Sequence, residues 1–181
     1  MRTLGISVVL ALLAAVVVMA ERQASPPAIA MAATAPAQAG AAAMKLYSSA
    51  ADVQALLAKA KNERKEGQVM VAEPILSLAP YATNLEYRPV EGAVAVHEKE
   101  AELVYVIDGG GTLTTGGTVL GEKRTNAANL SGTAIDGGTI QTIAKGDFTI
   151  IPEGTPHQFK PAGGPLVMMT MHVPRPVGGA Q

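Results

Sequence analysis

One segment near the C-terminal end carries the clearest structural signal in this sequence. It reads Gly146-Asp147-Phe148-Thr149-Ile150-Ile151-Pro152-Glu153-Gly154-Thr155-Pro156-His157. Residues 148–151 predict a strand. Pro152 and Gly154 predict a turn, because proline fixes φ and glycine tolerates a positive φ. The chain then reverses and brings His157 to the start of the next predicted strand.

The sequence around this segment consists of short apolar stretches separated by glycine, proline, asparagine and aspartate. We expect strands at residues 69–71, 75–78, 85–90, 93–97, 103–107, 112–120, 139–143, 148–151, 157–160 and 166–173. Many short strands with frequent turns are typical of an all-β sandwich or barrel, not of βαβ units. Residues 121–138 are polar, and we expect a long loop there, either functional or simply exposed to solvent.

Ahead of the strands, the sequence predicts a single amphipathic helix over Ser49–Arg64. Ser49 is a suitable N-cap, and Asp52 follows at the spacing of a capping box. Val53 and Leu57 belong to an apolar stripe at helical intervals, which should pack against the sheet. The folded domain is therefore expected to span residues 45–178.

The N-terminal part of the chain differs in composition from this domain. Residues 1–20 combine a basic start with an uncharged apolar run, which predicts a secretory signal peptide and an exported, periplasmic or secreted protein. A buried helix and an uncleaved membrane anchor are the alternatives. Residues 21–44 are rich in alanine and proline and lack bulky apolar side chains, so we expect a flexible linker.

Composition excludes several classes of function. The 181 residues carry a formal net charge of -1, with 16% charged and 48% hydrophobic residues, as in a folded domain. The near-neutral charge and an aromatic content of 3% argue against nucleic acid as a partner. The absence of cysteine excludes a disulfide framework, a thiolate nucleophile and a zinc finger.

The segment 146–157 resembles the second motif of the cupin superfamily, which is a glycine, five residues, Pro-x-Gly, two residues and a histidine. The first cupin motif is His-x-His, three or four residues, a glutamate, six residues and a glycine. His97, Glu102 and Gly109 resemble its first histidine, its glutamate and its glycine. Lys99 stands where the second histidine should be. The resemblance implies a jelly-roll β-barrel, with one N-terminal helix in this chain.

The resemblance also implies a metal site. In cupins the motif side chains point into one end of the barrel and bind a divalent metal, which implies His97, Glu102 and His157 as ligands here. Two imidazoles and one carboxylate suit Fe, Mn, Ni or Zn and leave positions open for water or substrate. Cupins frequently dimerise, so the resemblance also suggests a homodimer.

Lys99 leaves three alternatives open. On a strand it would share a face with His97, where its ammonium group would be repelled by a metal ion. It can turn away to pair with Glu98 or Glu100, or bind an anionic substrate near the metal. In the third alternative the site holds no metal, and Lys99 pairs with Glu102.

Two functions therefore follow from the sequence. The first is a metal-dependent enzyme acting on a small polar or anionic molecule by isomerase, oxygenase or lyase chemistry, with Lys99 as a substrate-binding residue. The second is a non-catalytic small-molecule binding or sensing module of the cell envelope, without a functional metal. The third histidine of the chain, His172, matches no motif, and we expect it to be structural.

Overall fold

The structure is a computed structural model that describes residues 44–175. These residues belong to one unit, which covers residues 40–181. The predicted signal peptide, nearly all of the predicted linker and residues 176–181 lie outside the described residues. The start of the predicted domain at residue 45 falls within them.

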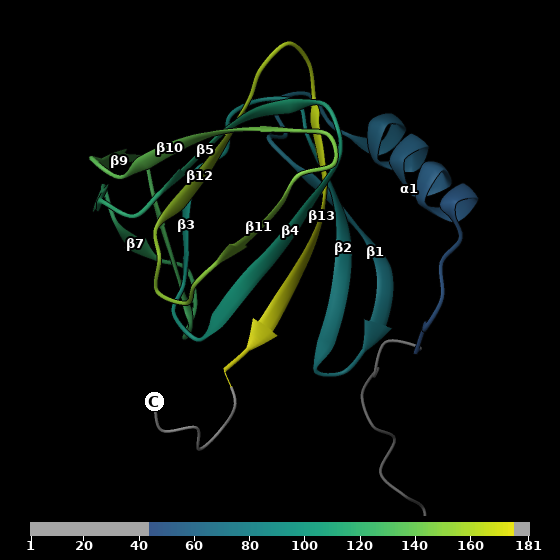
Figure 1. Ribbon diagram of the computed structural model, residues 1–181, viewed down its shortest axis with the longest axis horizontal. Helices are drawn as coiled ribbons and strands as arrows, with labels where there is room; N and C mark the ends of the chain where they lie inside the picture. Colours follow the sequence, from purple (N-terminus) through teal and green to yellow (C-terminus); the bar gives the residue numbers. More distant parts are fainter. Residues whose placement is uncertain (1–43, 176–181) are drawn as a thin grey trace, which may run out of the picture. The chain divides into compact units, whose positions relative to one another are not determined.

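Two antiparallel sheets form the body of this unit (Figure 1). The first has the order β1 (Val71–Leu78), β2 (Tyr81–Arg88), β13 (Leu166–Pro174), β4 (Glu100–Asp108) and β11 (Phe148–Ile151). The second has the order β10 (Thr139–Ala144), β5 (Gly110–Thr115), β12 (His157–Pro161), β3 (Val94–His97), β8 (Asn129–Gly132) and β7 (Lys123–Arg124). A two-stranded sheet pairs β6 (Thr118–Leu120) with β9 (Ala134–Asp136).

The core of the barrel is one cluster of buried side chains from both large sheets. Its members are Val104, Val106, Leu113, Ile143, Ile151, Phe159, Leu166 and Met168. Burying one such side chain stabilises the fold by about 1.5–3 kcal/mol. The alternation of the predicted strands thus places one face of each sheet inward, which confirms the all-β jelly roll.

The predicted helix is also confirmed, as α1 (Ala50–Glu63). Ser49 caps it, and both hydrogen bonds of the capping box with Asp52 are present. Leu57 and Ala60 join a second buried cluster on the outer face of the first sheet, beside β1 and β2 (Figure 1). Among the described residues, no helix is long and apolar enough to cross a membrane.

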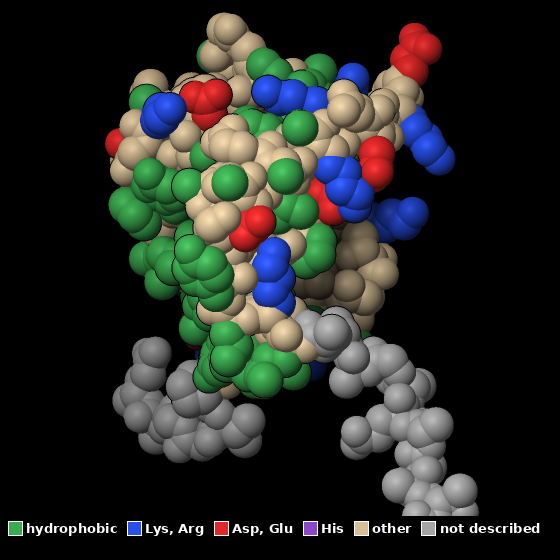
Figure 2. All heavy atoms as spheres, turned by 90° about the vertical axis from the view of Figure 1, so that its right-hand side faces the viewer, with side chains coloured by type: hydrophobic (Ala, Val, Ile, Leu, Met, Phe, Trp, Pro, Cys, Tyr) green, Lys and Arg blue, Asp and Glu red, His purple; other side chains and the backbone are tan. Residues whose placement is uncertain are grey.

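The helix side of the molecule is viewed in Figure 2. Acidic and basic side chains are interspersed there, and hydrophobic side chains gather toward one margin. One ion pair fastens the helix to the sheet, because Nζ of Lys59 lies 2.8 Å from Oε2 of the buried Glu73. This ion pair therefore contributes to the packing of the helix on the first sheet.

The expectation of a long loop at residues 121–138 is wrong. This segment contains β7, β8 and β9, and β8 extends the second sheet by pairing with β3. Its strands are only two to four residues long, too short to show an apolar alternation, and they are held by backbone hydrogen bonds with neighbouring strands. We call residues 121–138 the insert, and it places Asn129 directly opposite His97.

Candidate metal centre

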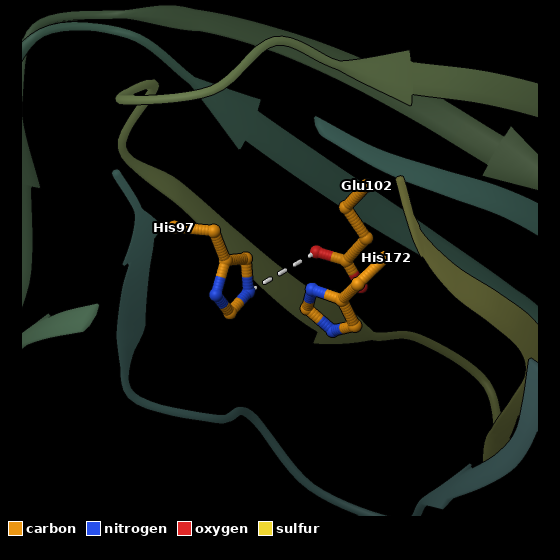
Figure 3. Close-up of side chains that lie close together, drawn as sticks. All are labelled: His97, Glu102 and His172. Carbon is orange, nitrogen blue, oxygen red and sulfur yellow. Dashed lines mark ion pairs between the residues drawn. The ribbon is translucent and has the colours of Figure 1, made fainter. Parts of the chain in front are cut away.

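Strand topology brings four polar side chains to the same end of the barrel. His97 is the last residue of β3, and Glu102 lies near the start of β4. His157 opens β12, which runs antiparallel to β3, and His172 lies close to the end of β13. All three histidines of the chain therefore come together. Figure 3 shows His97, Glu102 and His172 pointing toward one another.

Glu102 is the centre of this cluster. Its side chain is only 3% exposed, and its Oε2 atom lies 3.0 Å from Nε2 of His157 and 3.6 Å from Nε2 of His97. The same Oε2 atom makes no hydrogen bond of acceptable geometry. A buried carboxylate oxygen without a hydrogen bond is costly unless a cation lies nearby. The cluster thus carries an unsatisfied negative charge in its interior.

The pKa of Glu102 follows from the same contacts. Burial raises the pKa of this carboxyl, but the imidazoles of His157 and His97 lower it by more. The net result is a pKa far below its ordinary value, so the carboxylate is charged at neutral pH. For His97, burial lowers the pKa, while Glu102 and Asn129 raise it by more, and the net pKa is raised. In the metal-free chain, Glu102 and Asn129 therefore favour the protonated form of His97.

Two of the imidazoles are held with their Nε2 atoms facing Glu102. Nδ1 of His97 donates a hydrogen bond to Oδ1 of Asn129 at 2.8 Å, and Nδ1 of His157 donates one to the carbonyl oxygen of Thr155 at 3.0 Å. Both partners are oxygens that only accept, so the proton sits on Nδ1 of each ring. In the neutral rings Nε2 then carries a lone pair, which is the arrangement that metal-binding histidines require.

The insert holds His97 by more than one contact. Beside the bond to Asn129, the backbone N–H of Glu98 donates to the carbonyl oxygen of Ala128 at 2.8 Å. The guanidinium group of Arg124 binds both carboxylate oxygens of Glu98, at 2.7 and 3.1 Å. Asn129 is thus a site residue that the sequence analysis missed, because its position opposite His97 depends on strand pairing across the insert.

His172 also lies in this cluster, whereas the sequence alone led us to expect a structural role for it. One ligand atom each of His97, Glu102 and His172 lie within 4.8 Å of one another. The alternation of residues along the predicted strand 166–173 already indicated that the side chain of His172 points inward. On a strand, Met168, Thr170 and His172 share a face, and Met168 and Thr170 are fully buried.

Lys99 lies elsewhere than the sequence analysis assumed. The strand β3 ends at His97, and Lys99 is exposed in the bend before β4. The argument that it shares a strand face with His97 therefore fails. Among the ion pairs of the described residues, Glu98 pairs with Arg124 and Glu100 lies beside His172. The role of Lys99 in substrate binding stays a prediction.

The residues present fit a divalent transition metal. His97, Glu102 and His172 each offer one ligand atom within 4.8 Å of the others, and Oε2 of Glu102 lacks a hydrogen bond. His97 and His157 offer Nε2 lone pairs, because Nδ1 of each ring is hydrogen-bonded. Ligands about 2.1 Å from a metal ion lie about 3.0–3.4 Å from each other, which is close to the observed spacings around Glu102. The donor set of imidazole and carboxylate suits Fe, Mn, Ni or Zn, and does not select among them.

No protein-family model matches the sequence, and no curated protein resembles it closely enough to be counted as a relative. Solved structures with a similar fold include TT1209 from Thermus thermophilus, at 19% identity and a TM-score of 0.46 over 66% of this chain and 95% of that one. The cupin domain of Cnp3 from Schizosaccharomyces pombe matches at 13% identity and a TM-score of 0.46 over 64% and 72%. A cupin 2 conserved barrel domain protein from Rhodopseudomonas palustris matches at 15% identity and a TM-score of 0.43 over 61% and 67%.

The class is defined by the chain itself. The two antiparallel sheets, the motif at residues 146–157 and the histidine–glutamate cluster at one end make the described residues a cupin-type jelly roll.

Proposed function

We propose that this chain binds a divalent transition metal ion through His97, Glu102 and His157 and acts on a small polar or anionic molecule. The observation that carries the proposal is the buried Oε2 atom of Glu102, which has no hydrogen bond and is faced by two imidazole Nε2 atoms. A bound metal would supply a Lewis acid and a template for the substrate.

The surrounding residues determine how a substrate reaches this site. Glu102 and His157 are each 3% exposed, whereas the side chain of His97 is 19% exposed and that of His172 is 33% exposed. Access is therefore from the side of His97 and His172. The opposite side is closed by the apolar core of the barrel, which excludes water. A small molecule that enters would meet the ligand set from its outer side.

Charged groups at this entrance favour a polar or anionic molecule. Lys99 is exposed in the bend that follows His97, and its carbonyl oxygen accepts a hydrogen bond from the backbone N–H of Arg175. The guanidinium group of Arg175 pairs with Glu153. We propose that Lys99 attracts and holds an anionic group of the substrate at the entrance. The reaction would belong to the isomerase, oxygenase or lyase type.

A second function is favoured by a specific departure from the cupin pattern. Lys99 replaces the second histidine of the first motif, so the chain has lost one of the usual ligands. A non-catalytic small-molecule binding or sensing module would use the same end of the barrel without a metal. In that case the charge of Glu102 would be balanced by protonated His97 in the working protein.

Elemental analysis separates the two functions. The full chain is purified without chelator, beside His157→Ala and, as a matched control on the same strand, Lys160→Ala. We expect near-stoichiometric transition metal in the wild type and in the control, and loss of that metal in His157→Ala. A metal-free wild type that also fails to take up Fe, Mn, Ni and Zn would remove the metal-dependent function and leave the binding module.

The cellular context belongs to the same proposal. The signal-like residues 1–20 and the linker-like residues 21–44 support export to the periplasm or beyond the cell, with a small molecule as the partner and no nucleic acid. N-terminal sequencing of the chain from the producing cell should find a start at Glu21. An intact chain recovered from the cytoplasm would contradict export. Light scattering tests the suggested homodimer separately.

A further inference from the structure

His172 lies at the more exposed side of the cluster, and one of its ring nitrogens has no hydrogen-bond partner. Its Nδ1 atom is buried and makes no hydrogen bond. The nearest acidic group is the carboxylate of Glu100, whose Oε2 atom lies 3.3 Å from that Nδ1 without the geometry of a hydrogen bond. A histidine with a purely structural role would be expected to satisfy its buried nitrogen. This nitrogen is left available.

The strand pairing explains why His172 reaches the cluster. His172 lies directly opposite Glu102 in the register of β13 and β4, so the two side chains stand on the same face of the first sheet. The ring of His172 meets the ring of His97 edge-on, with centroids 4.3 Å apart. Figure 3 shows the ring turned toward Glu102 and His97. The position of His172 is set by the pairing of β13 with β4 in the first sheet.

The replacement of the second motif histidine by Lys99 suggests a role for His172. The sequence provides no second histidine in the first motif, and Lys99 lies outside the cluster in an exposed bend. The barrel nevertheless gathers three imidazoles and one carboxylate, because the third imidazole arrives on the last strand. The number of nitrogen donors is kept, while the strand that supplies one of them has changed.

We propose that His172 is a fourth protein ligand of the metal and binds it through Nδ1. This inference rests on the proposed function, because it assumes a metal at His97, Glu102 and His157. The two rings held by Asn129 and Thr155 would bind through Nε2, and His172 through its other nitrogen. Four protein ligands would still leave a six-coordinate metal open to water or substrate.

The test uses the fact that the chain has three histidines, all of them in the cluster. The full chain is labelled with ¹⁵N-histidine and titrated with Zn²⁺ alone, and each ring signal is assigned from the spectrum of a His→Gln variant. We expect all three rings to take on the shifts of metal-bound nitrogen and to stop titrating between about pH 5 and pH 8. For His172 the shifted atom should be Nδ1.

The other outcomes are distinguishable. If the rings of His97 and His157 shift while His172 continues to titrate, the metal site stands and the fourth ligand is disproved. If no ring shifts, both the metal site and the fourth ligand are disproved. Each result is read from the wild-type chain, and the His→Gln variants serve only to assign its ring signals.

An affinity measurement adds a second readout. His172→Gln is compared with Met171→Leu, a change at the neighbouring residue of β13 whose side chain lines an outer groove. We expect at least about tenfold weaker Zn²⁺ binding for His172→Gln, since even residues that only support a ligand are worth about 10–100-fold. Met171→Leu should stay within about twofold of the wild type. Equal affinity in both variants would overturn the proposal.

Discussion

Two regions of this protein hold a histidine against the same carboxylate, and they do so by different means. His157 follows the turn between β11 and β12, and its Nδ1 bonds to the carbonyl oxygen of Thr155, two residues earlier. His97 ends β3, and its Nδ1 bonds to Asn129, thirty-two residues later in the chain. The first arrangement is complete within one short motif. The second needs the insert.

The difference teaches where this site is vulnerable. The region around His157 is local, so it forms whenever the turn between β11 and β12 forms. The region around His97 depends on β8 pairing with β3 and on Arg124 reaching Glu98. Changes in the insert should therefore affect His97 and leave His157 in place. Changes at Glu102, which both histidines share, should affect the whole site.

The largest effect is expected from Glu102→Gln, which removes the charge common to both regions. Metal affinity should fall by more than about 100-fold, because losing a ligand costs more than losing a group that supports one. Isothermal titration with Zn²⁺ measures this change. Glu91→Gln, at a surface carboxylate paired with Lys160, is the control and should bind as the wild type does. Unchanged affinity in Glu102→Gln would remove Glu102 from the site.

The comparison itself is tested at Asn129. Asn129→Ala removes the acceptor of Nδ1 of His97, so this ring can rotate and change its tautomer, and metal affinity should fall by about 10–100-fold. Asn129→Asp keeps an oxygen in the same place and should restore most of the affinity. Asn126→Ala, in an exposed turn of the insert, is the control. If the alanine variant at position 129 binds normally, the insert does not position His97.

Two glycines allow the regions to be compared in stability. A side chain at Gly132 of β8 would meet the side chain of Val119 and lie 2.9 Å from the carbonyl oxygen of Leu120. Gly132→Ala should therefore cost about 2 kcal/mol of unfolding free energy through overpacking. Gly154 has a φ of +70° and open space around its Cβ position. Gly154→Ala should cost about 1 kcal/mol, from backbone strain alone.

Urea unfolding measures both of these changes. The Gly132→Ala variant should also bind metal more weakly, because β8 carries Asn129. A larger loss of unfolding free energy in Gly154→Ala than in Gly132→Ala would contradict the close packing of β8 against β6 and the open space around Gly154.

The smallest effect concerns pH in the metal-free chain. Because the pKa of His97 is raised in the folded state, its stabilising contribution is complete below its ordinary value of 6.5 and is lost as pH rises through the raised value. Because the pKa of Glu102 is lowered, its contribution is present above its ordinary value of 4.5 and is lost as pH falls toward the folded value. Stability should decline on the alkaline side of about pH 6.5, and His97→Gln should remove that decline. A wild-type stability that rises between about pH 6.5 and pH 8 would contradict it.

The sequence predicts most of this fold because its strongest signals are local. The capping box of Ser49 and Asp52 lies within one turn of helix. The turn between β11 and β12 is indicated by Pro152 and Gly154, which are two residues apart in the sequence. The short strand β8 carries no such signal. Its residues Asn129–Gly132 include one bulky apolar side chain, Leu130, and they form a strand because β3 and β7 offer backbone partners on both sides.

The site was predictable in part for the same reason. His157, Glu102 and His97 are all recognised from motif spacing. His172 needed the register of two distant strands, although its alternation with Met168 and Thr170 already indicated an inward face. Lys99 was misplaced because the alternation of a strand was applied two residues beyond His97, where both the predicted strand and β3 end.

The central claim is that His97, His157 and Glu102 share one metal ion, although one histidine is held locally and the other from a distance. Crystals of the chain grown with Mn²⁺ or Zn²⁺, with data collected at the absorption edge of that metal, test this most directly. The account predicts a single strong anomalous peak within about 2.0–2.3 Å of Nε2 of both histidines and of Oε2 of Glu102. Anomalous density absent from this end of the barrel, or bound only to surface carboxylates, would contradict it.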